Sequence, residues 1–363
     1  MQFLSATKIF TGQEWVQNRV IVIENGIINS VLNKDECEPS AIQYFEGMFV
    51  PAFIDAQVYG AAGKLLAVYP QKETLQLMHE VFLKTGTVLF LPTLATNTIE
   101  VFKKGIDAVR MYWEDGGKGV AGLHLEGPWL HPEKRGAHVR ELIHVPDVNE
   151  VTDLLEYGKG VIRMITIAPE VCSNEIIELI KSHDIIISAG HSNANYQHAM
   201  ESFDKGIETV THLYNAMSGL HHREPGLVGA AFQHEKVWAS VIPDGYHVDY
   251  AAIAIAKKIM NSRLFAITDA VTETATGPYQ HVLAGDKYEC NGVLSGSALS
   301  MHQAFLNLVQ HVGIEIGEAL KMCSLYPAML LQCDNRYGKI APGYRAQFVV
   351  IDKQLKLVDT IVL

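Results

Sequence analysis

The sequence of 363 residues lacks the features that mark several large classes of protein. No apolar run is long enough to cross a bilayer, and no basic block occurs in a chain whose formal net charge is −11. The first residues, Met1–Ser5, lack the basic and then apolar regions of a secretory signal peptide. We therefore expect neither a nucleic-acid-binding nor a membrane protein.

Cysteine is scarce and shows no pairing pattern. The five cysteines are widely spaced, their number is odd, and no CxxC pair occurs: Cys37, Cys172, Cys290, Cys323 and Cys333. A disulfide framework or a cysteine-based metal site is not indicated, and free thiols in a reducing compartment fit the pattern better. We expect a cytoplasmic protein.

Apolar residues are abundant in the chain, and charged residues are comparatively few. Hydrophobic residues make up 48% of the chain and charged residues 19%, so a long disordered stretch is not expected. The length suits a barrel-sized domain with a minor appendage, or two medium domains. No internal repeat and no low-complexity segment is present.

Both ends of the chain carry strand patterns. The strand-like segments are Val20–Glu24, Ile27–Val31, Gln347–Ile351 and Val358–Val362. Asn25-Gly26 between the first two is the strongest short hairpin signal. We predict one small β-sandwich domain assembled from residues 1–49 and 341–363.

The middle of the chain, residues 50–340, alternates apolar runs with segments of helical periodicity such as Lys72–Lys84 and Tyr250–Asn261. The apolar runs are Phe49–Ile54, Val88–Leu91, Val120–Leu125, Ile162–Ile167, Ile185–Ala189, Thr209–Leu213, Trp238–Ile242 and Leu264–Thr268. Continuous apolar runs suit parallel strands buried on both faces, and eight of them predict an α/β fold, a (β/α)8 TIM barrel. A doubly wound open sheet is the alternative. Two more helices are expected over residues 298–312 and 316–333.

Several predicted strands end on a polar residue that could carry chemistry. Glu126, His191 and Asp269 closely follow the third, fifth and eighth apolar runs, and His212 lies near the end of the sixth. A single histidine there is more often structural, and a single aspartate is usually a helix N-cap. Four such residues at equivalent positions indicate a functional site, because a barrel places these strand ends at one face.

The residue types suit a metal-assisted hydrolysis. One carboxylate and two imidazoles, from Glu126, His191 and His212, suit zinc or iron(II) and leave one coordination position open. Such a cation lowers the pKa of water from about 15.7 toward about 7. Asp269 would then act as the base and later return the proton to a leaving amine.

Six motifs occur in order and together resemble those of the N-acetylglucosamine-6-phosphate deacetylases of the amidohydrolase superfamily. They are residues 124–129 (HLEGPW), 189–194 (AGHSNA), 211–217 (THLYNAM), 223–226 (REPG), 244–249 (DGYHVD) and 294–297 (LSGS). The resemblance spans nearly the whole chain and includes residues 338–343 (GKIAPG) near the C-terminal strands. Each motif is weak alone, whereas the ordered set is specific.

The resemblance implies roles for individual residues. It gives Glu126, His191 and His212 to one divalent metal ion per subunit, zinc in preference to iron(II) or another ion, and makes Asp269 the general acid/base. His138 would polarise the acetamido carbonyl. The residues implied in binding a phosphorylated amino sugar are Ala137, His138, Asn215, Ala216, Arg223, His247, Leu294, Ser295 and Gly296. His247 and Arg223 would bind the phosphate, the arginine from the neighbouring subunit of a homodimer.

The first strand departs from the wider superfamily pattern. Many members carry His-x-His there to hold a second metal, whereas this chain has Gln57 and Tyr59. An amide oxygen and a neutral phenol are poor ligands for zinc or iron, so we predict one metal. Members of the deacetylase family with one metal also have glutamine at the first position, but often asparagine at the second. The role of Tyr59 is open.

Other features are given structural interpretations. Residues 117–122 fit GxGxxG but precede a strand, contrary to the dinucleotide fingerprint. The remaining helix and loop histidines are interpreted as surface or packing residues: His79, His183, His198, His281 and His311. Two alternative functions remain, another amidohydrolase such as a cyclic amidase or deaminase, and a non-catalytic sugar-phosphate binding protein.

Overall fold

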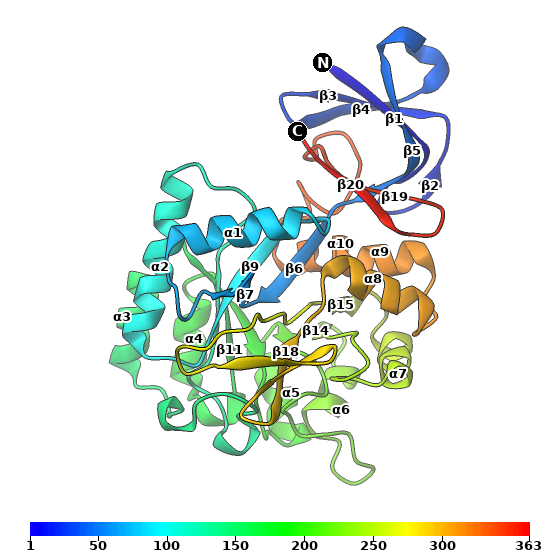
Figure 1. Ribbon diagram of the computed structural model, residues 1–363. Helices are drawn as coiled ribbons and strands as arrows, with labels where there is room; N and C mark the ends of the chain where they lie inside the picture. The colour runs from blue at the N-terminus through cyan, green and yellow to red at the C-terminus, as the bar shows by residue number, and fades with distance from the viewer. The chain divides into compact units, whose positions relative to one another are not determined.

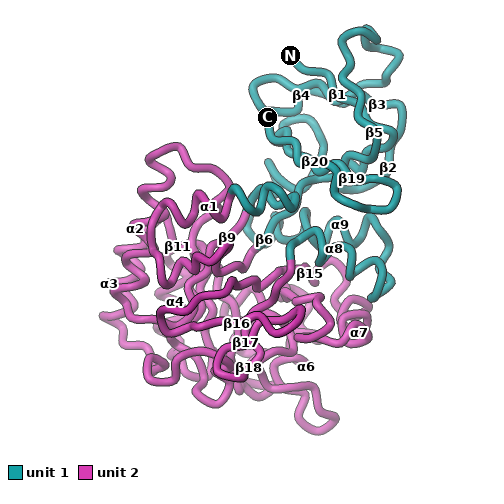
Figure 2. The backbone as a smooth tube through the Cα atoms, viewed as in Figure 1, with its two compact units in different colours: residues 1–55, 80–89, 300–363 teal, residues 56–79, 90–299 magenta.

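The computed structural model describes residues 1–363, which form two compact units. Unit 1 comprises residues 1–55, 80–89 and 300–363, and unit 2 comprises residues 56–79 and 90–299 (Figure 2). The division at residues 49 and 341 that we expect from the sequence remains a proposal. No helix is both long and apolar enough to span a membrane.

Unit 1 contains the β domain that both termini build. Its strands are β1 (Gln2–Phe10), β2 (Trp15–Val16), β3 (Arg19–Glu24), β4 (Ile27–Asn33), β5 (Ile42–Pro51), β19 (Gln347–Ile351) and β20 (Leu357–Val362). They pair in the order β20-β19-β5-β1-β3-β4, with β2 on β1. Phe49, Ile21 and Phe348 lie in its apolar core. Asn25 and Gly26 both have positive φ at the β3–β4 turn, which confirms the predicted hairpin.

Three helices also belong to unit 1: α8 (Met301–Gln310), α9 (Ile316–Cys323) and α10 (Leu325–Leu330). The second helix expected at 316–333 is therefore two, separated at Ser324. Pro327 accounts for the break, because it cannot donate a backbone hydrogen bond to Cys323 and its ring would clash there.

The main architectural element is a parallel sheet of eight strands. In sheet order they are β6 (Phe53–Val58), β9 (Thr87–Ala95), β10 (Leu123–Glu126), β11 (Ile162–Ile167), β12 (Ile186–Ala189), β13 (Thr209–Val210), β14 (Trp238–Val241) and β15 (Leu264–Ala266). Every residue of β6, β9 and β10 is buried, as in strands covered on both faces. A parallel bridge between Val58 and Ala270 connects the ends of β6 and β15, which closes the barrel. The predicted TIM-barrel fold class is confirmed.

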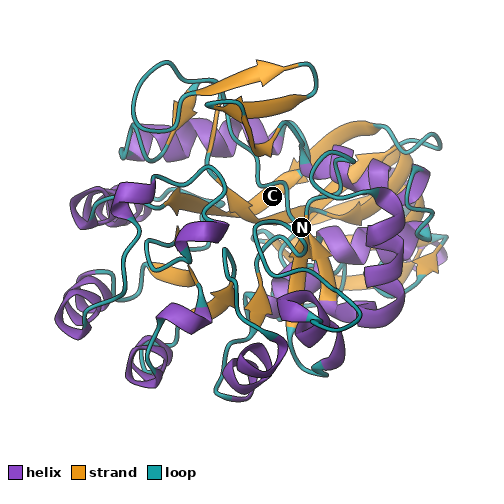
Figure 3. Ribbon diagram, turned by 90° about the horizontal axis from the view of Figure 1, so that it is seen from below, coloured by secondary structure: helices purple, strands orange, loops and turns teal.

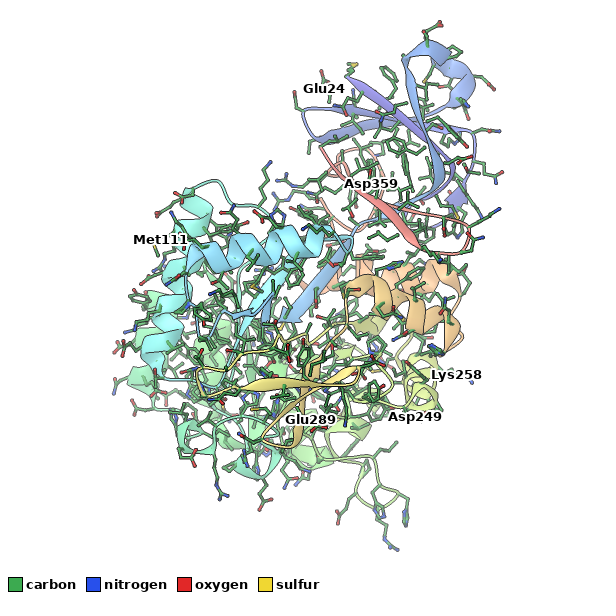
Figure 4. The ribbon with its side chains drawn as sticks, viewed as in Figure 1. Glu24, Met111, Asp249, Lys258, Glu289 and Asp359 are labelled. Atoms are coloured by element: carbon green, nitrogen blue, oxygen red, sulfur yellow. The ribbon has the colours of Figure 1, made fainter.

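Helices follow most of these strands and lie outside them (Figures 1 and 3). They are α1 (Lys72–Leu83), α2 (Ile99–Glu114), α3 (Val148–Tyr157), α4 (Asn174–Lys181), α5 (Tyr196–Asp204), α6 (Gly226–Gln233) and α7 (Tyr250–Met260). Thr98, Ser173 and Asn195 begin helices by accepting a hydrogen bond from a backbone N–H. The outer faces are solvated, as at Met111 on α2 and Lys258 on α7 (Figure 4).

Two features differ from the expectation. The run Phe49–Ile54 is not one strand, because β5 ends at Pro51 and β6 begins at Phe53. After β15 the chain adds an antiparallel three-stranded sheet, β16 (His281–Ala284), β17 (Lys287–Cys290) and β18 (Val293–Ser297). The motif segment Leu294–Gly296 is thus part of a strand. The shorter pair β7 (Gly60–Ala61) and β8 (Lys64–Leu65) was not expected either.

Candidate metal centre and active site

Four chemically active side chains converge at the carboxyl ends of the barrel strands. Glu126 is the last residue of β10, while His191, His212 and Asp269 closely follow β12, β13 and β15. All four are at most 6% exposed. This is the face at which barrel enzymes carry their active sites, since the strands run parallel and their ends meet there.

Three of these side chains have the geometry of a metal-binding cluster. Glu126 Oε1 lies 3.1 Å from His212 Nε2 and 3.4 Å from His191 Nε2, and the two nitrogens are 3.1 Å apart. Ligands about 2.0–2.2 Å from a tetrahedral ion are about 3.3 Å from one another. The spacing and the donor types therefore fit a divalent cation such as zinc or iron(II).

The backbone around the cluster orients its ligands. The carbonyl oxygen of Lys134 lies 2.8 Å from His191 Nδ1, so this nitrogen carries the ring proton and Nε2 presents its lone pair. Glu170, after β11, accepts hydrogen bonds from the Ser192 hydroxyl at 2.7 Å and from the Asn193 backbone. These contacts fix the segment that directly follows His191.

Backbone strain concentrates at the same place. His191, His212 and Asp269 have φ values of +48°, +33° and +54°. Positive φ costs free energy in residues with a Cβ and persists where the surrounding structure enforces it, as at active sites. Tyr214 and Ala216 share this conformation in the segment after β13. The strained backbone therefore coincides with the place where the His191, His212 and Asp269 side chains converge.

Gln57 and Tyr59 lie beside the cluster. Gln57 Nε2 is 3.0 Å from Glu126 Oε1 and 2.7 Å from Asp269 Oδ1. The Tyr59 hydroxyl donates to Glu126 Oε2 and lies 3.3 Å from Asp269 Oδ1. Burial and the charges of Asp269 and Glu126 raise the Tyr59 pKa well above its ordinary value, so the phenol stays protonated. Sequence reasoning left these two residues without a site role.

The two carboxyl groups differ in their proton affinity. Burial would raise the Glu126 pKa, but the contacts of this carboxylate with the His138, His191 and His212 rings outweigh burial and hold the pKa well below its usual range. Burial raises the Asp269 pKa; His212 opposes that rise and the charge of Glu126 adds to it. Glu126 is thereby suited to remain a charged ligand, and Asp269 is suited to accept and release a proton.

His138 joins the cluster from the segment after β10. Its Nδ1 receives the Thr96 backbone N–H at 3.3 Å, and its Nε2 lies 3.3 Å from Glu126 Oε2. Burial and the charge of His191 lower its pKa to about 4, so the ring is neutral near pH 7. A backbone N–H can only donate, which places the single ring proton on Nε2. His138 therefore presents a hydrogen-bond donor to the site.

A cavity of about 400 Å³ opens onto these groups and lies entirely within unit 2. Its volume is typical of a small-molecule site, roughly 300–1,000 Å³. It brings together almost all the residues proposed for substrate contact: Ala137, His138, Asn215, Ala216, His247, Leu294, Ser295 and Gly296. Lys134 is the one lysine or arginine in the lining. The individual roles remain predictions.

The two residues proposed to bind the phosphate differ in whether they line the cavity. His247 lines the cavity, and its Nδ1 is 2.6 Å from Asp244 Oδ2. Burial would raise the Asp244 pKa, but hydrogen bonds from His247 outweigh it, so the carboxylate is charged and accepts the Nδ1–H. Arg223 is exposed, outside the cavity lining, on the segment between β13 and α6, which projects from unit 2 (Figure 1).

The surface-or-packing interpretation of His281 is incomplete. This residue begins β16, is 5% exposed and lines the cavity, and burial lowers its pKa to about 4. Sequence reasoning also missed Tyr279, whose hydroxyl donates to the Thr96 carbonyl at 2.6 Å and whose ring faces His138. Neither residue lies at a barrel strand end, so the pattern that located the other groups could not reveal them.

With this fold and site described, comparison with known proteins defines the class. The family model of the amidohydrolase family matches residues 48–362, so the chain belongs to that family and is a hydrolase. Two curated relatives match it along nearly its whole length. An N-acetylgalactosamine-6-phosphate deacetylase of Escherichia coli O157:H7 is 31% identical, covering 97% of this chain and 95% of the relative. An N-acetylglucosamine-6-phosphate deacetylase of Haemophilus influenzae is 32% identical, covering 98% and 96%.

A solved structure agrees with these matches. The crystal structure of N-acetylglucosamine-6-phosphate deacetylase from Pasteurella multocida superimposes with a TM-score of 0.94 at 30% identity, over 99% of this chain and 98% of that one. The fold and the family resemblance predicted from the sequence motifs are thus confirmed.

Proposed function

We propose that this amidohydrolase removes the acetyl group of N-acetyl-D-glucosamine 6-phosphate, giving D-glucosamine 6-phosphate and acetate. The observation that carries the proposal is the buried cluster of Glu126, His191 and His212 beside Asp269, at the base of a cavity sized for a small molecule. The deacetylases similar to the chain over nearly its full length support the reaction and the phosphorylated amino sugar as its substrate.

One divalent cation per subunit completes the site. Glu126, His191 and His212 would hold it, and the donor set favours zinc, with iron(II) or another divalent ion as the alternative. Bound there, such an ion would supply Lewis acidity, which lowers the pKa of water toward neutral pH.

The protein's own residues carry the proton transfers. Asp269 accepts a proton from the attacking water as the new carbon–oxygen bond forms, and its raised pKa suits that task. His138 donates its Nε2–H to the carbonyl oxygen of the acetamido group, where negative charge develops. Asp269 then delivers its proton to the sugar nitrogen as the carbon–nitrogen bond breaks. The products are an amine and a carboxylic acid, so atoms and protons balance.

Recognition of the sugar phosphate is assigned to the rest of the cavity. Asn215 and Ala216 would contact the sugar, as would the strand segment Leu294–Gly296. His247 would bind the phosphate through Nε2, since Asp244 occupies Nδ1. Arg223 would supply a planar pair of donors to the phosphate of a neighbouring subunit, because it lies outside its own chain's cavity. This assignment requires a homodimer; a cytoplasmic location is the matching expectation.

The main alternative substrate is the epimer that differs in configuration at C4 of the sugar. The relative from Escherichia coli is named for the galactosamine epimer, so N-acetyl-D-galactosamine 6-phosphate is the second candidate substrate. Acetate release from both phosphorylated sugars and from unphosphorylated N-acetylglucosamine tests the choice. We expect the highest kcat/KM for the glucosamine phosphate. Equal rates on the unphosphorylated sugar would contradict the phosphate roles of His247 and Arg223, and a higher value for the galactosamine phosphate would transfer the proposal to it.

A further inference from the structure

Two neutral side chains connect the two buried carboxylates of the site. Gln57 Nε2 contacts both Glu126 Oε1 at 3.0 Å and Asp269 Oδ1 at 2.7 Å. The Tyr59 hydroxyl also contacts both, donating to Glu126 Oε2 and lying 3.3 Å from Asp269 Oδ1. The two neutral groups also contact one another, at 2.9 Å between Gln57 Nε2 and the Tyr59 hydroxyl. We call Gln57 and Tyr59 the neutral clamp.

The neutral clamp lies between Glu126 and Asp269, where a second metal ion bridging the two carboxylates would have to bind. Gln57 provides two amide hydrogens and Tyr59 one phenolic hydrogen, and the contacts within the clamp and with the two carboxylates share these three hydrogens without any positive charge. A second ion between Glu126 and Asp269 would have to displace these hydrogens. It would also gain only an amide oxygen and a neutral phenol as further ligands, which bind zinc and iron poorly.

The charge balance of the two carboxylates also favours a single divalent ion. Glu126 and Asp269 together carry at most two negative charges, which one divalent ion beside Glu126 balances. His138 Nε2 and the Tyr59 hydroxyl both approach Glu126 Oε2, whereas Oε1 faces His191 and His212. The clamp therefore holds Glu126 in an orientation that presents one oxygen to one ion.

We propose that Tyr59, with Gln57, is a positioning residue that takes the place of a second metal ion, limiting the centre to one cation and fixing Glu126 and Asp269. A packing role is the simpler interpretation, because the Tyr59 ring also contacts the apolar cluster that includes Leu65, Val271 and Tyr279. The two interpretations differ at the hydroxyl. Packing needs only the ring, whereas the clamp needs the donor oxygen.

Metal counting tests the clamp without substrate, and its outcome is therefore independent of the proposed reaction. Metal-free wild type, Tyr59→Phe and the double variant Gln57→His/Tyr59→His are saturated with zinc, freed of excess ion and analysed for bound metal. We expect one zinc per chain in wild type and Tyr59→Phe, and two in the double variant. Two ions in the wild type would overturn the proposal. A double variant that is folded by circular dichroism and still binds one would do the same.

Tyr59→Phe decides the question if the double variant fails to fold. This change keeps the ring and removes the hydroxyl, so a buried carboxylate loses a donor. We expect the metal-free variant to melt several degrees below the metal-free wild type. In the metal-loaded form, kcat should fall at least tenfold with KM within twofold. Tyr44→Phe, which removes an exposed hydroxyl in unit 1, serves as the matched control and should change nothing. If Tyr59→Phe equals wild type in melting and kcat, Tyr59 only packs.

Discussion

The Nε2 atoms of His191 and His212 lie 3.1 Å apart, although the two residues follow different strands of the barrel. Two imidazole nitrogens at this distance repel one another unless a proton or a cation lies between their lone pairs. The proton on His191 is directed to the Lys134 carbonyl instead, through Nδ1. A divalent cation bound by both nitrogens and by the nearby Glu126 carboxylate satisfies this geometry, and the predictions below depend on it.

The substitution Asp269→Asn separates metal binding from proton transfer. An amide keeps the shape of the side chain but cannot accept the proton of the attacking water, so kcat should fall by about 10²–10⁴-fold. The metal content should stay at one ion per chain, because Asp269 is outside the Glu126–His191–His212 cluster. Acetate release and metal analysis on the same sample measure both. Near-normal kcat would remove Asp269 from the mechanism.

His138→Ala tests the donor directed at the carbonyl oxygen. Loss of one such donor should lower kcat by about 10²–10³-fold with little change in metal content. His144→Ala is a suitable control, because His144 is partly exposed and its ring contacts Glu150 and a backbone carbonyl rather than the cavity. If His138→Ala lost metal instead of turnover, the residue would be a ligand and our assignment would be wrong.

Mixing two inactive variants tests whether Arg223 acts on the neighbouring subunit. Arg223→Met and Asp269→Asn chains are each expected to be weakly active at low substrate concentration. A mixed dimer contains one site with intact Asp269 that faces an intact Arg223 of the other chain. Activity should therefore reappear when the two proteins are unfolded, mixed and refolded together. If refolded mixtures show only the sum of the separate activities, Arg223 does not act across an interface.

His281 should make stability depend on pH. Burial lowers its pKa to about 4 in the folded state, whereas an unfolded histidine titrates near ~6.5. Between these two pH values His281 is protonated in the unfolded chain and neutral in the folded protein. Stability is therefore lost as the pH falls from about 6.5 toward about 4. The full loss is about 3 kcal/mol, because each unit of pKa difference is worth about 1.4 kcal/mol.

Thermal melting of the metal-free protein at a series of pH values measures this effect. His281→Phe should melt with a shallower dependence on pH over that interval than wild type. His198→Phe, on the exposed side of α5, is the control and should follow wild type. Parallel curves for His281→Phe and wild type would show that His281 takes up its proton equally in both states.

Residues at the ends of barrel strands could be predicted from the sequence, whereas residues elsewhere in the site could not be located by the same pattern. Glu126, His191, His212 and Asp269 were predictable because apolar runs mark the barrel strands and each residue stands at or just past the end of one. His138, Asn215, Ala216 and His247 could be singled out only through motif resemblance, since they lie on connecting segments without periodicity. The hairpin at Asn25-Gly26 was predictable because its turn chemistry is local.

The missed features depend on tertiary contacts. Tyr279 and His281 reach the cavity through the sheet β16–β18, whose strands are short and interrupted by turns at Gly285 and Gly292. The contacts of Tyr59 join residues 67 and 210 positions apart, which no local pattern reveals. The boundary between β5 and β6 was also missed, because the apolar run continues across it while the pairing partners change from β19 to the barrel strands.

We infer that deacetylation requires one cation held by Glu126, His191 and His212. The most direct test strips the protein of metal, confirms that it remains folded, and measures acetate release from N-acetyl-D-glucosamine 6-phosphate while one ion type at a time is added back. We predict no turnover without metal and full activity at one equivalent of zinc or iron(II) per chain. Undiminished acetate release by the metal-free protein, or no release with any divalent ion, would contradict the account.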